Sequence, residues 1–438
     1  MSISFDIKTF GCKVNTYDTA LLQKRLQNSG YLMTEGTPQI HILNTCAVTR
    51  EATNEAIKEI NRIKKKNPQS VVVVTGCAAQ VDTGSFENVP ADLVIANSHK
   101  GLLETLIKQH LNGELTQKVF HSNIFRKADL EENGGVEAEH TRAFLKIQDG
   151  CNSFCTFCVI PFARGKSRSL SIPHLVEKIN EFTAQGLNEV VLTGVHIGDY
   201  ESDDGKIFDD LIEAVLAQTK MPRIRLSSLE PIEISDRLLE MYSDDRMCPH
   251  FHMSIQSANT KVLADMKRKY TAEHVEDSLN RILRKFQDRK LKAPFIGMDV
   301  IAGFPGETEE EFNDTYERLK RTPWTRMHVF PYSERPGTKA LNIDPKVPNH
   351  LIHARAERLR QLSAERYSMM ALEQIGEIKK VLVLKSKAKG ASTLSRDYWP
   401  VDVEISSEAQ IGTEISVKIV GYDQSNQSRI DGFLKGSL

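Results

Sequence analysis

Three cysteines lie within one short segment of the chain, GCNSFCTFCVIP. Cys151, Cys155 and Cys158 follow a C-x3-C-x2-C pattern, and three thiolates this close together can hold one face of a 4Fe–4S cluster. With only three protein ligands, the fourth iron would stay open to bind a small molecule. Structural zinc is the alternative, but it takes four ligands, and no fourth Cys or His is close in the sequence. The segment therefore predicts an iron–sulfur cluster with one open iron.

Three further cysteines share no local motif, because more than 30 residues separate each from the next. Cys12, Cys46 and Cys77 each follow the end of a predicted strand. Parallel strands end at one edge of their sheet, where such sheets bind ligands, so the three thiols are expected to converge on one crevice. There they could hold a second three-cysteine cluster, although any one of them alone would be interpreted as an inert buried thiol. Cys248 has no partner by either argument and is expected to be structural.

The elements that position these N-terminal cysteines alternate between strand and helix over the first 110 residues. Helical spacing is seen over 16–28, and again through Ile57, Ile60 and Ile63 up to the stop at Asn67-Pro68. This alternation predicts a parallel, layered α/β sheet. Its expected strands are 3–10, 40–43, 71–74 and 93–95.

The middle of the chain repeats the alternation, and the end departs from it. Six strand and helix units in about 190 residues predict an open, partial (β/α)6 barrel, followed by a long charged helix over 349–373. After Gly376 the segments KKVLVL, YWPVDVEI and EISVKIVGY predict a small all-β barrel of the OB kind. The barrel strands are expected at 143–149, 189–193, 223–227, 250–256, 295–302 and 326–332.

These patterns together place the chain in the α/β class with three domains. The expected division is an N-terminal parallel-sheet domain over 1–115, a linker over 116–140, the partial barrel with its C-terminal helix over 141–372, and the small β-barrel over 373–438. The linker is assigned from its loss of periodicity and its Glu, Asn and Gly content, as in EENGGVEAE.

Composition excludes several classes of protein. The 438 residues carry 57 Lys and Arg against 58 Asp and Glu, a net charge of −1, so any nucleic-acid surface must be a local patch. No signal peptide and no run of 18 apolar residues is present in the sequence, so no membrane association is expected and the location predicted is the cytoplasm. Seven cysteines in such a chain indicate metal or redox chemistry rather than disulfides.

Several segments carry a resemblance to a known family. FGCKVNTYDTA, ILNTCAVT, VTGCAAQ, the C-x3-C-x2-C segment, SIQSANTKVLADMKRKYT and DVIAGFPGETEEEF together resemble the radical S-adenosylmethionine (SAM) methylthiotransferases. The likeness covers essentially the whole chain, including a TRAM-like barrel at the C-terminus. VLTGVHIGDY, RLSSLEP and HVFPYSERPGTKA look most like the branch that modifies threonylcarbamoyladenosine in tRNA.

The resemblance implies cofactors, a reaction and partners. It implies two 4Fe–4S clusters, one on Cys151, Cys155 and Cys158 and an auxiliary one on the three N-terminal cysteines, together with two molecules of SAM. One SAM would methylate a sulfur of the auxiliary cluster. The other would yield the radical that opens the substrate C–H bond, which general bases cannot do. The implied partners are the tRNA anticodon stem-loop, modified at position 37, and an electron donor such as flavodoxin or ferredoxin.

A few other residues are candidates for SAM contact. Gly194 ends the strand EVVLTG, where such enzymes bring backbone close to SAM, although glycine also ends strands for turn reasons alone. Ser254 and Gln256 alternate on one strand and would point the same way, either to SAM or to each other. Arg164 and Arg168 could neutralise the SAM carboxylate or a substrate phosphate, or could belong to a solvated loop.

Other polar and aromatic features suggest contacts with RNA but have plain structural explanations. Basic stretches at 61–67, 267–270 and 281–292 are typical of solvated helix faces that could add phosphate contacts. In the terminal barrel, Tyr398 and Tyr422 could stack on bases, whereas Trp399 is expected to pack in the core.

Alternatives remain open from the residues alone. Two other branches of the family modify isopentenyladenosine in tRNA or an aspartate of a ribosomal protein. A radical SAM enzyme could use its second cluster for electron transfer rather than for sulfur donation. A non-enzymatic, metal-stabilised RNA-binding protein would explain the terminal barrel and the basic helices, but not the three-thiolate motif.

Overall fold

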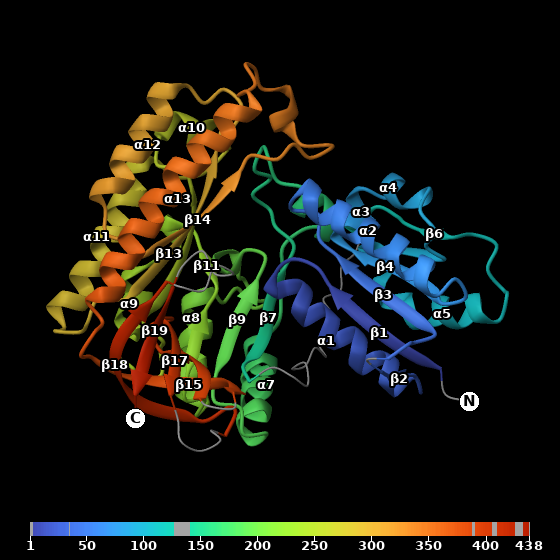
Figure 1. The fold of residues 1–438 in the computed structure, drawn as a ribbon, viewed down its shortest axis with the longest axis horizontal. Helices are drawn as coiled ribbons and strands as arrows, with labels where there is room; N and C mark the ends of the chain where they lie inside the picture. Colours follow the sequence, from blue (N-terminus) through green and yellow to red (C-terminus); the bar gives the residue numbers. More distant parts are fainter. Residues whose placement is uncertain are drawn as a thin grey trace.

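The computed structural model describes residues 3–34, 36–126, 141–387, 390–404, 410–424 and 432–437. Figure 1 shows the N-terminal sheet and its helices on one side of the molecule, a large middle part beside it, and a small red barrel against one end of the middle part. Within the described residues, none of the helices combines the length and the hydropathy that crossing a bilayer requires.

The N-terminal part is a six-stranded parallel sheet, which confirms the predicted class and its four strands. The strand order is β2-β1-β3-β4-β5-β6. The strands are β1 (Ser4–Thr9), β2 (Leu32–Met33), β3 (Ile40–Thr45), β4 (Val71–Gly76), β5 (Leu93–Ala96) and β6 (Val119–Phe120). The helices are α1 (Lys13–Asn28), α2 (Arg50–Lys66), α3 (Cys77–Val81), α4 (Gly84–Glu87) and α5 (Leu103–Leu111), with a 3-10 turn at Asn97–Leu102.

The two edge strands of this sheet were not predicted, because two-residue strands are too short to show a period. β6 lies within 116–140, so the first part of the segment assigned to a linker pairs with β5. Residues 127–140 of that segment lie outside the described residues. The central strands β3 and β4 are buried almost throughout, as their continuous apolar runs indicate.

The middle part contains the predicted partial barrel, built from two four-stranded sheets of order β10-β9-β7-β8 and β11-β12-β13-β14. The chain passes from one sheet to the other at Ser227, between β10 and β11. The strands are β7 (Ala143–Asp149), β8 (Arg168–Ser169), β9 (Val190–Gly194), β10 (Ile224–Leu226), β11 (Ser228–Leu229), β12 (His250–Gln256), β13 (Phe295–Ala302) and β14 (Arg326–Pro331).

Helices alternate with these strands along the chain and cover the outer side of the two sheets (Figure 1). They are α6 (Ile160–Arg164), α7 (Ile172–Ala184), α8 (Phe208–Gln218), α9 (Asp236–Met241), α10 (Thr260–Asp265), α11 (Ala272–Asp288), α12 (Glu309–Arg321) and α13 (Asn349–Leu372), with 3-10 turns at Ile124–Arg126, Ile197–Asp199, Pro231–Glu233 and Lys339–Asn342. Thr308 caps α12 in a capping box with Glu311, so the GFPGET segment ends in a helix cap.

The C-terminal part is a closed barrel of order β15-β16-β17-β19-β18. Its strands are β15 (Ile378–Lys387), β16 (Gly390–Ser395), β17 (Pro400–Glu404), β18 (Glu414–Asp423) and β19 (Phe433–Ser437). Trp399 is buried against Tyr367 of α13, which confirms its core role. Tyr398 stacks on His250 of β12 with ring centroids 4.0 Å apart, so the expectation that it stacks on bases is wrong.

A buried ion cluster joins the small barrel to the middle part. Glu189 accepts hydrogen bonds from Arg223 at 2.7 Å and from Arg225 at 3.0 Å, and all three side chains are 0% exposed. Arg223 also donates to Glu414 of β18 and to a backbone carbonyl of β16, and Arg225 donates to the carbonyls of the last residue of β16 and of the residue after it. Each guanidinium therefore depends on both parts of the molecule for its partners.

Replacing Glu189 with glutamine tests this cluster. Glu189→Gln leaves the buried guanidinium of Arg225 without a carboxylate and that of Arg223 with Glu414 alone, and we expect the free energy of unfolding to fall by about 3 to 5 kcal/mol in urea titrations. The matched control is Arg237→Ala, which removes an exposed pair with Glu213 and should leave the unfolding midpoint nearly unchanged. Equal, small shifts in both variants would contradict the role of the cluster.

Candidate active site

The sheet topology brings the three N-terminal cysteines together, as expected from their positions after strands of one parallel sheet. Cys12 caps α1 after β1, Cys46 follows β3, and Cys77 begins α3 after β4. Glycines permit the close approach: a Cβ atom on Gly11 would lie 2.6 Å from the Cys46 sulfur, and one on Gly76 would lie 2.4 Å from the Thr45 carbonyl oxygen. Both glycines have positive φ, so the Gly-Cys pair that ends β1 is repeated at the end of β4.

The environment of these thiols is suited to binding a metal group. Burial raises the pKa of Cys46 to about 12, and the neighbouring Cys77 and Cys12 contribute to this rise. Burial also raises the pKa of Cys77. Two buried thiols that cannot both ionise unaided are stabilised as thiolates when a metal centre supplies positive charge. Cys12 is exposed and lies at the edge of the group.

A buried charge network lies beside the three cysteines. Arg164 donates to Asp18 at 3.0 Å and to Asp149 at 3.0 Å. Lys146 donates to Asp18 at 2.6 Å and Lys100 to the same carboxylate at 3.3 Å. All five side chains are at most 10% exposed. Burial by itself raises the pKa of the Asp18 carboxyl. The three cations Lys146, Lys100 and Arg164 outweigh this effect and hold the pKa of Asp18 well below its ordinary value.

The buried charge network is unbalanced by itself, with three cations and two carboxylates. Burying an uncompensated charge is costly, so a net charge of +1 requires an anionic neighbour. Burial lowers the pKa of Arg164, but Asp149 and the sulfur of Cys77 are the leading groups that raise it well above its ordinary value. An iron–sulfur group carried on three thiolates is anionic, so the residues present fit such a group.

Arg335 supplies a further buried cation on the same side of the sheet. Its side chain is 2% exposed, and its Nε has no hydrogen-bond partner among the described residues. Its guanidinium lies 3.5 Å from the Thr53 hydroxyl and 3.7 Å from Asp82. Burial lowers its pKa, while Asp82 and Cys46 act in the opposite direction. An orphaned buried donor near Cys46 again indicates an anionic group at this position.

Two asparagines connect the cysteine loops to α6. Asn15 donates to the carbonyls of Phe10 at 2.8 Å and Thr45 at 3.0 Å, and it accepts a hydrogen bond from Arg164 at 2.7 Å. The Asn97 amide lies 3.7 Å from the Cys77 sulfur and donates to the carbonyl of Ala163 in α6 at 2.9 Å. Since α6 begins two residues after Cys158, the two groups of cysteines are adjacent in space.

Hydrogen-bond donors also surround the second group of cysteines. The backbone N–H groups of Ser153 and Ile160 donate to the sulfurs of Cys151 and Cys158, each at 3.4 Å. The Arg268 guanidinium donates to the Cys155 sulfur at 3.3 Å. Such donors stabilise thiolates and tune the potential of a bound cluster. This group therefore also fits an iron–sulfur cluster.

Four titratable side chains beside this second group were missed by the sequence analysis. His196 Nδ1 lies 3.8 Å from the Cys151 sulfur, and its Nε2 is hydrogen-bonded to Glu233 and lies 3.5 Å from Glu230. Glu230 pairs with Arg268 at 3.0 Å. The expectation that 267–270 is a solvated basic stretch is wrong for Arg268, whose side chain is 7% exposed. His196 follows β9 and the two glutamates follow β11, so their positions after strands could have indicated them, whereas Arg268 follows α10 and carries no such signal.

The predicted SAM contacts lie in this region but have structural partners. A Cβ atom on Gly194 would lie 2.9 Å from the Gln148 carbonyl, so close packing requires glycine there. The backbone carbonyl of Ser254 accepts a hydrogen bond from Arg268, and Gln256 has a φ of 62°. Arg168 donates to the carbonyl of Arg164. The Arg164 side chain is committed to the buried charge network, which corrects its expected role toward SAM carboxylate or phosphate.

A cavity of about 890 Å³ lies between the N-terminal and middle parts. One wall is the segment that follows Cys46, including Arg50, and another is formed by Phe330 and Tyr332 at the end of β14. Tyr332 packs on Phe304, which packs on Phe157 beside Cys158. Phe330 is 43% exposed. The cavity is large enough for a nucleotide-sized ligand, and its walls are connected to both cysteine-bearing segments, by chain to Cys46 and by ring packing to Phe157.

Comparison with known proteins identifies the family. Residues 4–96 match the uncharacterized protein family UPF0004, and residues 145–319 match the radical SAM superfamily. The threonylcarbamoyladenosine tRNA methylthiotransferase MtaB of Aquifex aeolicus is 35% identical over 96% of this chain and 100% of its own length. The chain belongs to the radical SAM tRNA methylthiotransferase family. Membership of the radical SAM superfamily implies SAM and a 4Fe–4S cluster as cofactors.

Other members of the family are similarly related. MtaB of Bacillus subtilis is 36% identical over 94% of this chain and 93% of its own length. The tRNA-2-methylthio-N(6)-dimethylallyladenosine synthase of Desulfotalea psychrophila is 33% identical over 87% of this chain and 88% of its own length. Among solved structures, the radical SAM methyltransferase TsrM of Kitasatospora setae has a TM-score of 0.54 at 15% identity, covering 76% of this chain and 77% of that one. That last likeness concerns the fold alone.

The thiols of this methylthiotransferase should differ in reactivity. Burial raises the pKa of Cys151, but hydrogen bonds with His196 and Ser153 bring it below its ordinary value, whereas burial raises the pKa of Cys158 to about 12. A lower pKa leaves more thiolate near neutral pH, so in metal-free protein iodoacetamide should modify Cys151 at least about tenfold faster than Cys158. Mass spectrometry of the labelled peptides measures both rates. His196→Ala should slow only Cys151, and equal rates in the wild type would contradict the assignment.

Proposed function

We propose that this enzyme converts N6-threonylcarbamoyladenosine at position 37 of tRNA to its 2-methylthio derivative, using two 4Fe–4S clusters and SAM. The observation that carries the proposal is the adjacency of two three-cysteine groups, joined through α6. The relatives of A. aeolicus and B. subtilis bear the name of this activity.

The residues around the two groups have distinct roles in the proposal. When bound, the iron–sulfur groups and SAM supply the electrons, sulfur, methyl group and radical chemistry that an unactivated C–H bond requires. Cys151, Cys155 and Cys158 would hold one group, and with three protein ligands an iron would remain open to SAM. Arg268 and the backbone N–H groups orient the thiolates, while Glu230 and Glu233 offer carboxylates to the SAM amino group or ribose.

The cavity between the parts is proposed to receive the base. One wall is the segment that follows Cys46, and Tyr332 in another wall packs through Phe304 and Phe157 toward the segment of Cys158, which favours this cavity as the place for the base. Phe330 offers an exposed ring for stacking, and Arg50 offers a cation, which suits the carboxylate of a threonylcarbamoyl group. A nucleotide in a single-stranded loop, such as the one 3′ of the anticodon, is the least costly to unstack.

Dimethylallyladenosine is the second candidate substrate, because the D. psychrophila relative bears that name at 33% identity. Its substituent is apolar and has no carboxylate that could pair with Arg50. The experiment that decides is mass spectrometry of nucleosides after reaction of reconstituted enzyme with tRNA carrying one or the other modification. We expect the 2-methylthio product from threonylcarbamoyladenosine, and product only from the dimethylallyl substrate would overturn the proposal. A flavodoxin or ferredoxin is the proposed electron donor.

The division of labour between the cysteine groups gives a second test. Cys155→Ala should abolish reductive formation of 5′-deoxyadenosine from SAM, because the cluster proposed to cleave SAM loses one of its three cysteine ligands. The triple variant Cys12→Ala, Cys46→Ala, Cys77→Ala should lose about half of the bound iron, still form 5′-deoxyadenosine and make no methylthio product. Iron analysis and chromatography of the nucleosides measure these outcomes, and Cys248→Ala serves as the control. Methylthio product from the triple variant would contradict the proposed sulfur donor.

A further inference from the structure

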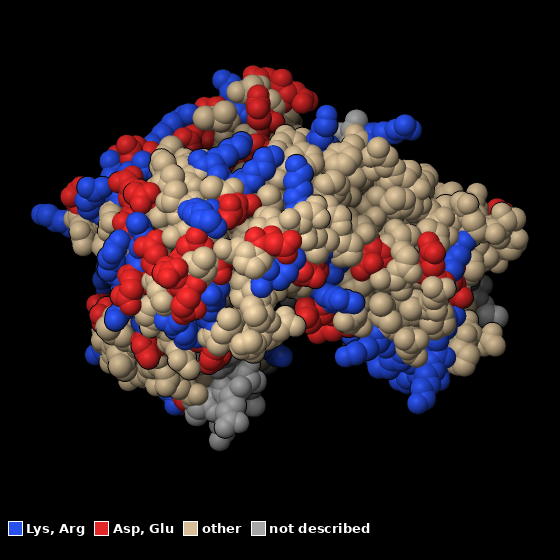
Figure 2. All heavy atoms as spheres, turned by 90° about the horizontal axis from the view of Figure 1, so that it is seen from above, with Lys and Arg blue, Asp and Glu red and all other residues tan. Residues whose placement is uncertain are grey.

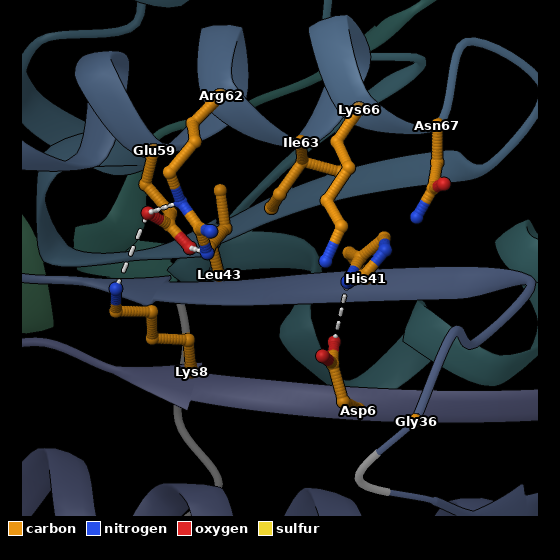
Figure 3. A pocket seen from close by; sticks show the side chains of 10 residues that line it. All are labelled: Asp6, Lys8, Gly36, His41, Leu43, Glu59, Arg62, Ile63, Lys66 and Asn67. Atoms are coloured by element: carbon orange, nitrogen blue, oxygen red, sulfur yellow. Dashed lines mark hydrogen bonds and ion pairs between the residues drawn. The ribbon is translucent and has the colours of Figure 1, made fainter.

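A second pocket lies in the N-terminal part, between α2 and the strands β1 and β3. Its volume is about 310 Å³, and it is lined by side chains of both strands and of the last turns of α2 (Figure 3). His41 lies at the start of β3, five residues before Cys46, so the pocket is about 16 Å from the cysteines along the strand. It is therefore separate from the candidate active site.

Three polar side chains in this pocket have unused hydrogen-bonding capacity. His41 is 8% exposed; its Nδ1 is paired with Asp6 at 2.9 Å, and its Nε2 has no partner among the described residues. Within the same described ranges, the Lys66 ammonium and the Asn67 side-chain amide form no hydrogen bond or ion pair with another residue. Figure 3 shows these three groups pointing toward one another.

The acidic groups of the pocket are already paired. Glu59 accepts from Arg62 at 2.6 Å and from Lys8 at 3.3 Å, and Asp6 accepts from His41. With Nδ1 bonded to Asp6, Nε2 is the ring nitrogen of His41 that still lacks a hydrogen-bond partner among the described residues. The charged side chains that line the pocket are three cations and two carboxylates, which leaves it net positive without any charge on His41. They are Lys8, Arg62 and Lys66, and Asp6 and Glu59. An anion with several acceptor oxygens satisfies all three unused groups.

The pocket opens onto a basic surface. The C-terminal half of α2 exposes Lys58, Arg62, Lys65 and Lys66. Figure 2 shows a compact group of Lys and Arg side chains on the N-terminal part of the molecule, whereas both signs of charge mix over the middle part. A single small anion would need only the pocket, but an extended basic face fits a polyanion with regularly spaced phosphates.

We propose that this pocket holds a backbone phosphate of the RNA substrate, with His41, Lys66 and Asn67 as its ligands. The inference rests on the tRNA substrate proposed above and adds an interaction away from the base. It gives the N-terminal part a role in RNA binding in addition to carrying cysteines.

Salt dependence of tRNA binding by the reconstituted full-length enzyme tests the pocket. A protein that neutralises one phosphate fewer releases fewer counterions, so the slope of log K against log salt should flatten by about 0.7 to 0.9. We therefore expect Lys66→Ala to weaken binding and flatten the slope by that amount, measured by fluorescence anisotropy between about 50 and 200 mM salt. His41→Gln should weaken binding as well. Lys66 is exposed, so Lys66→Ala is expected to fold normally even if the substitution of buried His41 disturbs folding.

The matched control is Lys220→Ala. Lys220 is also exposed and lies between α8 and β10, at the ends of the strands opposite the candidate active site. Its variant removes the same charge and should leave the slope unchanged. A slope flattened equally by Lys220→Ala, or unchanged by Lys66→Ala, would overturn the proposal.

Two further outcomes separate this inference from the proposed function. If the wild type binds tRNA and Lys66→Ala flattens the salt slope, the proposed phosphate site is supported even when no methylthio product forms. If wild-type enzyme binds no tRNA, both proposals fail. Calorimetry with inorganic phosphate tests whether the pocket instead binds a small anion. If Lys66→Ala abolishes phosphate binding but leaves the salt slope of tRNA binding unchanged, the pocket is a small-anion site, and RNA is overturned as its ligand.

Discussion

A buried guanidinium, that of Arg164, joins the two halves of the candidate active site. It is paired with Asp18 and Asn15 of the N-terminal part and with Asp149 of the middle part, and it lies next to the cysteine loops. Removing either carboxylate would increase the uncompensated positive charge that is buried there, so the position of the two parts relative to each other is strongly constrained. The net positive charge of the network also creates a place for an anionic cofactor.

The proximity of the two cysteine groups follows from this constraint. The helix that carries Arg164 is only five residues long and begins directly after the C-x3-C-x2-C segment. Val159 and Ala163 pack in the same apolar cluster as Cys46 and Cys77. Chemistry that passes a sulfur-containing group to a substrate requires donor and radical source to share one cavity, and a short rigid connection achieves this better than a flexible linker.

Much of the scaffold could be predicted because its elements carry strong local patterns. The six predicted strands of the partial barrel agree with the observed ones within a residue or two, since apolar runs bounded by turn residues are typical of buried parallel strands, whereas the two-residue strands β8 and β11 were not predicted. Pairing of charges was less predictable. Arg268 resembles a solvated residue in a basic stretch, yet it is buried between Glu230 and Cys155. Tyr398 resembles a stacking residue, yet it packs on His250.

The sequence by itself determined which cysteines form the two groups, because their spacing and their positions after predicted strands are local properties. Only the tertiary structure decided which charges compensate them. Asp18 meets Lys146 across 128 residues of sequence, and Asn15 meets Arg164 across 149. A charged side chain looks the same in sequence whether water or a buried partner solvates it. Its burial depends on contacts between distant segments, and these contacts exist only once the whole chain is folded.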